Sequence, residues 1–258
     1  MKQIQQGQLS TSIGGFSFIE NLNLSPIVNY NAPAILFGMY QNRDWETLTK
    51  LQSHVTIFWG GADSHGIRNV NLLKQSRFRH ITCTNKTKEN LNRLGIKCEL
   101  LTGLRSVFKN TLFSPTIKQD KIYSYIPHHR QAYYNKPMID SLNLGDKLLV
   151  GNFANGINQK DWANGAGLDY YSQCYLGLFL CTGSGGGTGI IEMGLCGIKV
   201  ITNVLEAPNT IPWKSKQDIL DIIQSEKNTI GNKDVNLANK VRDWLSPDIE
   251  FLKITTNL

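Results

Sequence analysis

The stretch GLFLCTGSGGGTGIIEMGLCGIKVITN, residues 177–203, has the pattern of a strand, a glycine-rich loop, a helix and a second strand. Residues 177–180 form an apolar run of the length of a buried strand, and residues 199–202 form a second run that is rich in β-branched side chains. Between them, residues 190–195 predict a short helix, which Gly197 closes as a C-terminal cap. This order predicts part of an α/β fold with a parallel sheet.

The loop before this helix carries the first prediction of a binding site. Glycines leave the unpaired N–H groups at the start of the helix without side chains to cover them, and such groups bind phosphate. Glu192, less than one turn inside the expected helix, is suited to a ribose or sugar hydroxyl. A mobile surface loop is the alternative, and the spacing matches neither the P-loop nor the dinucleotide-binding motif. The expected phosphate-binding residues are Ser184, Gly185, Gly186, Gly187, Thr188 and Gly189.

The same stretch resembles the donor-binding segment in the C-terminal lobe of GT-B glycosyltransferases. In that family a glycine-rich loop precedes a helix that reads roughly Glu-Ala-Met-Ala-x-Gly-x-Pro-Val-Ile, which matches residues 192–201 here. The resemblance is to retaining members of a compact viral or bacterial type, and it implies that Glu192 contacts the ribose of the donor nucleotide. Many retaining members carry another Glu eight positions earlier, where this chain has Ser184. The family's usual contact to the donor sugar is therefore not carried over.

Composition and cysteine usage narrow the class of protein. A hydrophobic content of 41% and a mean hydropathy of -0.25 are typical of a globular protein. No apolar run approaches the roughly 20 residues that span a bilayer, and the first residues lack the apolar core of a secretory signal, so we expect a cytoplasmic protein. The five cysteines include no CxxC pair, which favours reduced thiols. Neither cysteines nor histidines have metal-site spacing, so no metal is expected.

The net charge of +7 favours anionic partners in general. Nucleotide phosphates, an anionic membrane surface and nucleic acid are the classes to weigh. The basic residues form no long run and no nucleic-acid-binding signature is present, so nucleic acid is the class not expected. We expect a nucleotide sugar and a glycan or glycolipid acceptor as partners, peripheral contact with anionic membrane, and no cofactor besides the donor substrate.

Strands and helices alternate on both sides of residues 103–120, a stretch without clear periodicity. Strands are expected from residues 34, 55, 80 and 96, then at 121–126 and 147–153 and from residue 175. Helices are expected at 44–52, capped by Asp44, and at 69–75, 86–94, 130–142, 161–171, 215–226 and 235–245. Residues 1–33 predict no clear element.

Two such series predict an α/β protein with two Rossmann-like lobes, whose parallel sheets carry helices on both faces and face each other across a cleft. The arrangement is GT-B-like with a shortened N-terminal lobe. We expect residues 1–112 to form the acceptor lobe and residues 113–258 the donor lobe, with the last helix able to pack back on the first lobe.

Basic residues follow the first strand of the second series. Arg130 and Lys136 stand at its carboxyl end, where open α/β sheets bind ligands and where cations can neutralise a diphosphate. GT-B glycosyltransferases carry a basic pair after the same strand. Asn152 and Phe153 follow the next strand, where the family recognises base and ribose. Ordinary solvated positions are the alternative for all four residues.

In the first series, the sequence WGGADSHGIRN at 59–69 follows the second strand. It is similar to a tryptophan-glycine-x-aspartate loop of several glycosyltransferases, which implies that Gly60 and Gly61 lie on the acceptor side. Asp63 and His65 are the candidate catalytic residues, to orient or deprotonate an acceptor hydroxyl. An N-capping aspartate and a surface histidine are the alternative interpretation.

Together these features predict a glycosyltransferase of the hexosyltransferase type, independent of metal, that acts in glycan biosynthesis. It would move a sugar from a nucleotide-diphosphate donor to an acceptor hydroxyl of a glycan, lipid or protein glycoside, while the helix N-terminus stabilises the leaving diphosphate. One alternative is a nucleotide-sugar epimerase of the same fold, although few acidic residues and histidines are placed for that reaction. The other is a non-catalytic nucleotide- or polyanion-binding protein with a degenerate fold, which Ser184 favours.

Overall fold

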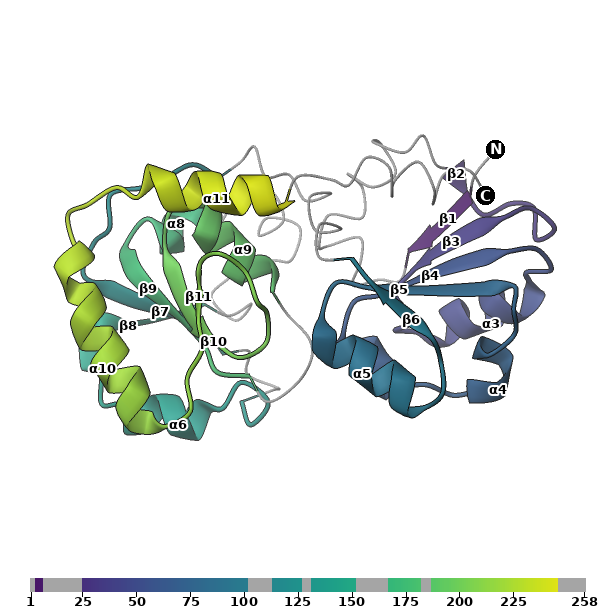
Figure 1. The fold of residues 1–258 in the computed structure, drawn as a ribbon, viewed down its shortest axis with the longest axis horizontal. Helices are drawn as coiled ribbons and strands as arrows, with labels where there is room; N and C mark the ends of the chain where they lie inside the picture. The colour runs from purple at the N-terminus through teal and green to yellow at the C-terminus, as the bar shows by residue number, and fades with distance from the viewer. Residues whose placement is uncertain are drawn as a thin grey trace. The chain divides into compact units, whose positions relative to one another are not determined.

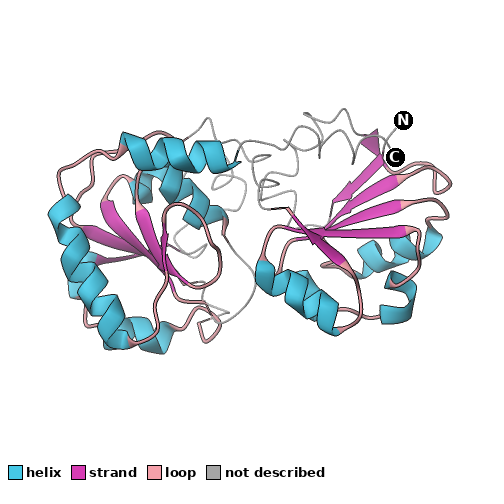
Figure 2. Cartoon of the chain, viewed as in Figure 1, coloured by secondary structure: helices cyan, strands magenta, loops and turns pink. Residues whose placement is uncertain are grey.

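The computed structural model describes residues 3–6, 25–101, 113–126, 131–151, 167–181 and 187–245. The chain divides into two compact units, one of Met1–Lys109 with Leu245–Leu258 and one of Asn110–Trp244. Each unit is built on its own parallel sheet, with helices packed against it (Figures 1 and 2). The predicted class, an α/β protein with two parallel sheets, is confirmed.

The sheet of the first unit has the strand order β2-β1-β3-β4-β5-β6, and all neighbours are parallel. Its strands are β1 (Gln3–Gln6), β2 (Ser25–Pro26), β3 (Ala34–Phe37), β4 (Val55–Trp59), β5 (Phe78–Thr82) and β6 (Cys98–Leu100). The helical segments are α3 (Asn42–Lys50), η1 (Ala62–His65), α4 (Val70–Leu73) and α5 (Asn85–Arg93).

The helices α3, α4 and α5 lie on one face of this sheet (Figure 1). Because β3 to β6 are neighbours in chain order, successive right-handed crossovers must fall on the same side. The expected helices on both faces are therefore not found among the described residues of this unit. Apolar side chains between the helices and the sheet form one buried core, which includes Leu36, Trp45, Leu48, Ile57, Trp59 and Leu91.

His80 is part of this core. Its Nδ1 accepts a hydrogen bond from Trp59 Nε1 at 3.1 Å, and its Nε2 lies 2.7 Å from the carbonyl oxygen of Leu73. Burial lowers the pKa of His80, which favours the neutral ring. A neutral ring with its proton on Nε2 satisfies both contacts, so His80 has a structural role.

The helix boundaries follow from side chains that bind the first-turn N–H groups. Asp44 was expected to cap the first helix but is its third residue, and its Oδ2 accepts hydrogen bonds from the backbone N–H of Tyr40 at 3.0 Å and Gln41 at 2.8 Å. The helix therefore begins two residues earlier than predicted. At the starts of α4 and α5 the arrangement is reversed, because the N-cap side chains of Asn69 and Thr84 accept from the backbone N–H groups of Leu72 and Thr87 inside the helices.

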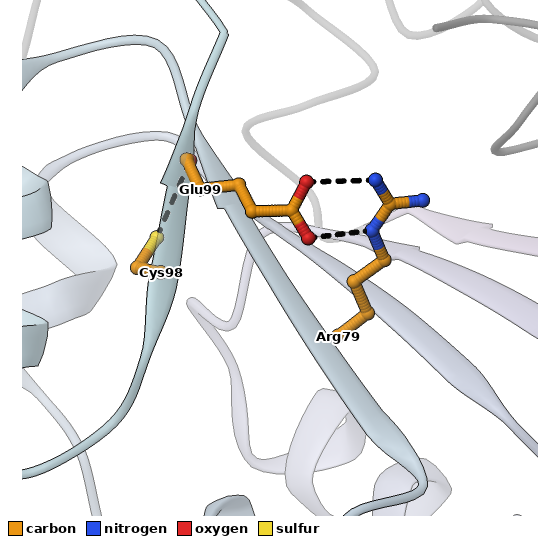
Figure 3. Close-up of polar contacts among 3 residues, drawn as sticks. All are labelled: Arg79, Cys98 and Glu99. Carbon is orange, nitrogen blue, oxygen red and sulfur yellow. Dashed lines mark hydrogen bonds and ion pairs between the residues drawn. The ribbon is translucent and has the colours of Figure 1, made fainter.

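A paired charge links the short edge strand β6 to β5. Arg79 donates from Nε to Glu99 Oε1 at 2.8 Å and from Nη2 to Oε2 at 2.7 Å, while the Cys98 thiol contacts the Glu99 carbonyl oxygen at 3.6 Å (Figure 3). The hydrogen bonds from Arg79 lower the pKa of Glu99, so the pair is charged at neutral pH. The two-pronged geometry supports the register of β6, although exposed pairs contribute only about 0–1 kcal/mol.

The sheet of the second unit has the order β11-β10-β9-β7-β8, again with parallel neighbours. Its strands are β7 (Lys121–Tyr125), β8 (Leu148–Gly151), β9 (Cys174–Phe179), β10 (Lys199–Thr202) and β11 (Thr210–Ile211). Its helices are α6 (Lys136–Ser141), α8 (Gly167–Tyr171), α9 (Thr188–Leu195), α10 (Lys216–Glu226) and α11 (Val235–Leu245), with short 3-10 turns η5 (Gly145–Lys147) and η8 (Lys227–Thr229).

Here the helices cover both faces of the sheet, with α8, α9 and α11 on one side and α6 and α10 on the other (Figure 1). The crossover from β7 to β8 runs in the opposite direction to the crossovers from β8 to β9 and from β9 to β10. Right-handed connections therefore place α6 opposite α8 and α9. In the described part of the chain, no helix is both long and apolar enough to cross a membrane.

In this unit the predicted start of α6 is wrong and one strand was not predicted. The helix expected at 130–142 begins only at Lys136, because Asn135 adopts the left-handed conformation with φ 52° and ends the preceding turn. The strand β11 was not predicted, since it is only two residues long. The segment expected at 161–171 is described only from Gly167, where α8 begins.

Helix α9 packs closely on both sides, at two glycines. A Cβ at Gly177 of β9 would lie 2.7 Å from Met193 Sδ, and one at Gly194 would lie 2.6 Å from Asn209 Cγ. The Asn209 amide donates to the carbonyl oxygens of Ile190 at 2.8 Å and Ile198 at 3.2 Å, and so ties the helix to the turn after it. The position of α9 is therefore fixed by contacts that leave no room for a larger side chain.

We expect Gly177→Ala to destabilise the second unit by about 1–3 kcal/mol, because the added methyl group overlaps Met193 and Val200 in a filled core. Gly66→Ala is the matched control, since the nearest atom to its Cβ is the Asp63 carbonyl oxygen at 3.8 Å. Urea unfolding of both variants measures the difference. Equal midpoints for the two variants would show that α9 can move away from β9 at little cost.

Candidate functional site

The carboxyl edge of the second sheet contains a reversal of strand order. β7 and β9 are neighbours, but the helix after β7 lies on one face of the sheet and the helix after β9 lies on the other. The segments that leave these two strands therefore diverge. Open α/β sheets bind their ligands at such a point, beyond the carboxyl ends of the strands.

Five of the predicted donor-binding residues lie among the described residues, on two helices. Gly187, Thr188, Gly189 and Glu192 belong to α9 and its N-cap, and Lys136 begins α6. These two helices follow β9 and β7, so both sets of residues come from the segments that flank the reversal. The remaining predictions, Arg130, Asn152, Phe153, Ser184, Gly185 and Gly186, lie outside the described residues.

Glycine is required at two positions at the start of α9, for two different physical reasons. Gly187 is the N-cap, with φ 150° and ψ -15°, a conformation that a side chain disfavours. Gly189 lies in the first turn, where a Cβ would come within 2.9 Å of the Phe179 ring and 3.3 Å of Tyr171 Oη. One glycine is required by the backbone and the other by packing. The N-cap thus offers no side chain to bind the first N–H groups of the helix, which suits an anionic ligand.

Glu192 lies deeper in the helix than predicted. α9 begins at Thr188, so Glu192 is its fifth residue, just over one turn inside rather than less than one. Its side chain is buried with 7% exposed, and Oε2 accepts a hydrogen bond of 2.7 Å from Tyr171 Oη. The sequence analysis did not predict this contact, because Tyr171 comes from a separate segment, α8. Glu192 is therefore held by a tyrosine that the motif does not contain.

Lys136 is the half-buried first residue of α6. Its Nζ lies 2.5 Å from Asp140 Oδ2, one turn farther along the same helix. Solvent-exposed pairs of this spacing contribute about 0.3–0.5 kcal/mol, so the ammonium group can exchange Asp140 for a phosphate at little cost. Three tyrosine rings from the residues before α6 pack together: Tyr125 lies edge-on against Tyr134 at 5.2 Å, and Tyr134 edge-on against Tyr133 at 5.1 Å. This aromatic group was not predicted.

In the first unit, Asp63 joins two turns at the carboxyl edge of the sheet. Its Oδ2 accepts from the backbone N–H of Met39 at 3.1 Å and Gly60 at 3.3 Å, and its Oδ1 from those of Gly61 at 2.8 Å and Ser64 at 3.1 Å. The side chain is buried, with 3% of its surface exposed. Burial raises the pKa of Asp63 to about 6, although the four hydrogen bonds oppose this shift. These contacts suit a group that positions the turn.

The other predicted catalytic residue, His65, has a different environment. It ends η1 with its ring exposed, and its Nε2 lies 3.3 Å from Asn90 Nδ2. Of the two candidates, His65 is the one whose side chain is accessible from solvent. An exposed imidazole nitrogen can accept a proton from a hydroxyl group.

One of the predicted acceptor-side glycines, Gly60, lies against a residue that the sequence analysis missed, Tyr40. A Cβ at Gly60 would overlap the Tyr40 hydroxyl, and a Cβ at Gly38 would overlap the Tyr40 ring. Gly61 is required by its backbone, with φ 126°. Tyr40 therefore lies against the turns that follow β3 and β4. The available signal was a glycine directly after each of these strands, at Gly38 and Gly60.

The described residues do not form a metal centre. Among the described residues, no group of three or more His, Cys, Asp or Glu side chains could hold a metal ion. None of the five cysteines, all of which are among the described residues, forms a disulfide, and Cys181, which follows β9, is the partly exposed one. Burial raises the pKa of Cys98, Cys174 and Cys196 to about 12, so these thiols stay protonated.

The comparisons with known proteins rest on structure. No protein-family model matches the sequence, and no curated protein matches it. TarM superposes on 93% of this chain with a TM-score of 0.58 and 10% identity, and sucrose-phosphate synthase from Thermosynechococcus elongatus on 97% with 0.53 and 12%. This chain spans 57% of the TarM chain and 77% of the synthase.

Both of these proteins are glycosyltransferases with the GT-B fold. At identities this low the likeness is one of fold, and it shows that the present chain has the GT-B fold. The fold prediction drawn from residues 177–203 is thereby confirmed.

A pH dependence follows from the environment of Asp63. Its pKa of about 6 in the folded protein exceeds the ordinary value of 3.8, so the folded state holds the proton more tightly than the unfolded state. The raised pKa of Asp63 makes its full contribution to the free energy of unfolding below about pH 4, and this contribution is lost as the pH rises through about 6.

We therefore expect the stability advantage of the wild type over Asp63→Asn to shrink between pH 4 and pH 7, by at most about 3 kcal/mol. Urea unfolding of both proteins across this range measures the effect. Since the other titrating groups are common to both, their difference isolates Asp63. Parallel pH profiles would contradict a raised pKa.

Proposed function

We propose that this chain is a glycosyltransferase that moves a sugar from a nucleotide-diphosphate sugar to an acceptor hydroxyl of a glycan, lipid or protein glycoside. The observation that carries the proposal is the glycine-capped start of α9, at the reversal of strand order, in a chain with the GT-B fold. The position suits the diphosphate of a nucleotide sugar, because the first N–H groups of the helix and its dipole favour negative charge.

The donor would be bound from both sides of the reversal. On the β9 side, the loop with Ser184, Gly185 and Gly186 would bring backbone N–H groups to the diphosphate, and Glu192 would contact the ribose. On the β7 side, Arg130 and Lys136 would neutralise its charge. Asn152 and Phe153, after β8, would contact the ribose and stack on the base.

The acceptor would be bound at the carboxyl edge of the first sheet, where Asp63 fixes the turns after β3 and β4. We assign His65 as the proton acceptor, with Asp63 as a positioning group and Tyr40 as a contact for the acceptor. In the transfer, the acceptor oxygen forms a bond to the anomeric carbon as its proton passes to His65. The bond from that carbon to the diphosphate oxygen breaks, and the leaving diphosphate keeps the electron pair, stabilised by the start of α9 and the two cations.

In this proposal the cations and the helix N-terminus neutralise the diphosphate without a metal ion. A cytoplasmic location and peripheral contact with anionic membrane belong to the proposal as well, the contact being supported by the net charge of +7. A hexose is the proposed class of transferred sugar.

A second candidate is a non-catalytic nucleotide-binding protein of the same fold. The observation that favours it is the burial of Glu192 against Tyr171, together with a serine at position 184, where many retaining relatives carry a second Glu. Such a protein would bind nucleotide sugars but would not release a nucleoside diphosphate from them when acceptors are supplied. Product release therefore separates the two candidates.

The first test is binding of UDP, GDP and ADP and their sugar conjugates by the wild type, Lys136→Ala and Lys147→Ala. Lys147 is the matched control, because it also pairs with an aspartate, Asp120, but precedes β8 at the opposite edge of the sheet. We expect Lys136→Ala to weaken diphosphate binding about tenfold, the value of one charge-assisted hydrogen bond of about 1.5 kcal/mol, and Lys147→Ala to leave it unchanged. Equal affinities for all three proteins would remove Lys136 from the site.

A further inference from the structure

Tyr171 connects three elements around the candidate donor site. It is the last residue of α8 and is fully buried, with 0% of its surface exposed. Its hydroxyl donates to Glu192 Oε2 at 2.7 Å and lies 3.3 Å from the Cβ position of Gly189. Gly189 and Glu192 are three residues apart on α9 and so share one face of the helix. The hydroxyl thus reaches the first turn of α9.

The ring of Tyr171 is held in place by other aromatic side chains. Tyr123 of β7 contacts it edge-on at 5.1 Å, and Phe113 lies at 6.2 Å. The backbone of Phe113 is itself fixed, because its carbonyl oxygen accepts a hydrogen bond of 3.1 Å from Arg242 Nη2 on α11. Few rotamers remain for a ring enclosed in this way, so the direction of its O–H group is set by the fold.

In the pair of Tyr171 and Glu192, Tyr171 is the hydrogen-bond donor. Burial and the neighbouring Glu192 charge both raise the pKa of Tyr171, so its hydroxyl keeps its proton. A carboxylate that loses a hydrogen-bond donor inside a protein is destabilised and must turn toward water or take up a proton. The placement of Glu192 in α9 therefore depends on a hydroxyl supplied by α8.

We propose that Tyr171 is a positioning residue for the donor nucleotide, which holds the Glu192 carboxylate where it contacts the ribose. This inference rests on the proposed function, since it takes Glu192 to be part of a nucleotide site. It makes one prediction that a merely structural role does not. Loss of the hydroxyl weakens binding of ligands that carry a ribose and leaves binding of inorganic pyrophosphate unchanged, because pyrophosphate contacts only the helix N-terminus and the cations.

The test compares Tyr171→Phe with Tyr175→Phe by calorimetric titration with UDP, GDP, ADP and inorganic pyrophosphate. Tyr175 is the matched control, since it is also buried, at 2% exposed, but packs with α6 and α10 on the other side of the sheet. We expect Tyr171→Phe to bind the nucleoside diphosphate preferred by the wild type about tenfold more weakly and pyrophosphate equally well, with Tyr175→Phe unchanged for both. The urea midpoint of each variant confirms that it is folded.

A second variant, Glu192→Gln, keeps the inference falsifiable if Tyr171→Phe does not fold, because unchanged nucleotide affinity in it would leave Tyr171 no ribose contact to position. Glu192→Gln retains an oxygen that can accept the Tyr171 hydrogen bond while removing the charge, and it should show the same selective loss of nucleotide affinity. If Tyr171→Phe folds, the two losses of affinity should not add in the double variant, because both substitutions weaken the same contact, that between the side chain of residue 192 and the ribose.

Three results would overturn the inference: unchanged nucleotide affinity in Tyr171→Phe or in Glu192→Gln, equal losses for nucleotide and pyrophosphate, or additive losses in the double variant. Each of these leaves the proposed function standing if the wild type binds a nucleoside diphosphate. Failure of the wild type to bind any of them would instead reject the proposed function, and this inference with it.

Discussion

The second unit depends on the close contact between helix α9 and the strands β9 and β10. Gly177 lets Met193 approach β9, Gly194 admits the Asn209 side chain, and Asn209 bonds the carbonyl oxygens of Ile190 and Ile198. A helix held in this way cannot slide or tilt without creating overlap or breaking buried hydrogen bonds. The start of the helix is therefore fixed relative to the carboxyl edge of the sheet.

The topology of the sheet then decides what this fixed helix can bind. Because β7 and β9 are neighbours while their following helices lie on opposite faces, the chain leaves the edge in two directions at one point. Helix α9 contributes N–H groups on one side, and α6 contributes Lys136 on the other. A diphosphate can bind both the helix N–H groups and the lysine ammonium group, and for this reason we propose that the donor binds at this edge.

Much of the fold could be predicted from the sequence because its strands are apolar and glycine or capping residues mark its helix ends. Helix α11 begins and ends where its pattern predicts, and α10 starts directly after its N-cap Ser215. β1 could not be predicted, because its sequence QIQQ lacks apolar alternation and its pairing with β3 uses the backbone. The start of α6 could not be predicted either, since it depends on the left-handed Asn135.

The candidate site was predictable only where a motif carried it, as with Glu192. Tyr171 and Tyr40 come from other segments, and only the glycines that make room for them, Gly189, Gly38 and Gly60, leave a trace in the sequence. The burial of Asp63 depends on N–H groups from two turns, which spacing alone does not show.

The central claim, that the start of α9 binds the diphosphate of a nucleotide sugar, is tested most directly by amide hydrogen exchange across the whole chain. Exchange would be measured with and without the nucleoside diphosphate that binds most tightly. We expect slower exchange in residues 181–195 and in the segment between β7 and α6, with no change in α10. Unchanged exchange at the start of α9 with a bound nucleotide, or protection confined to the first unit, would contradict it.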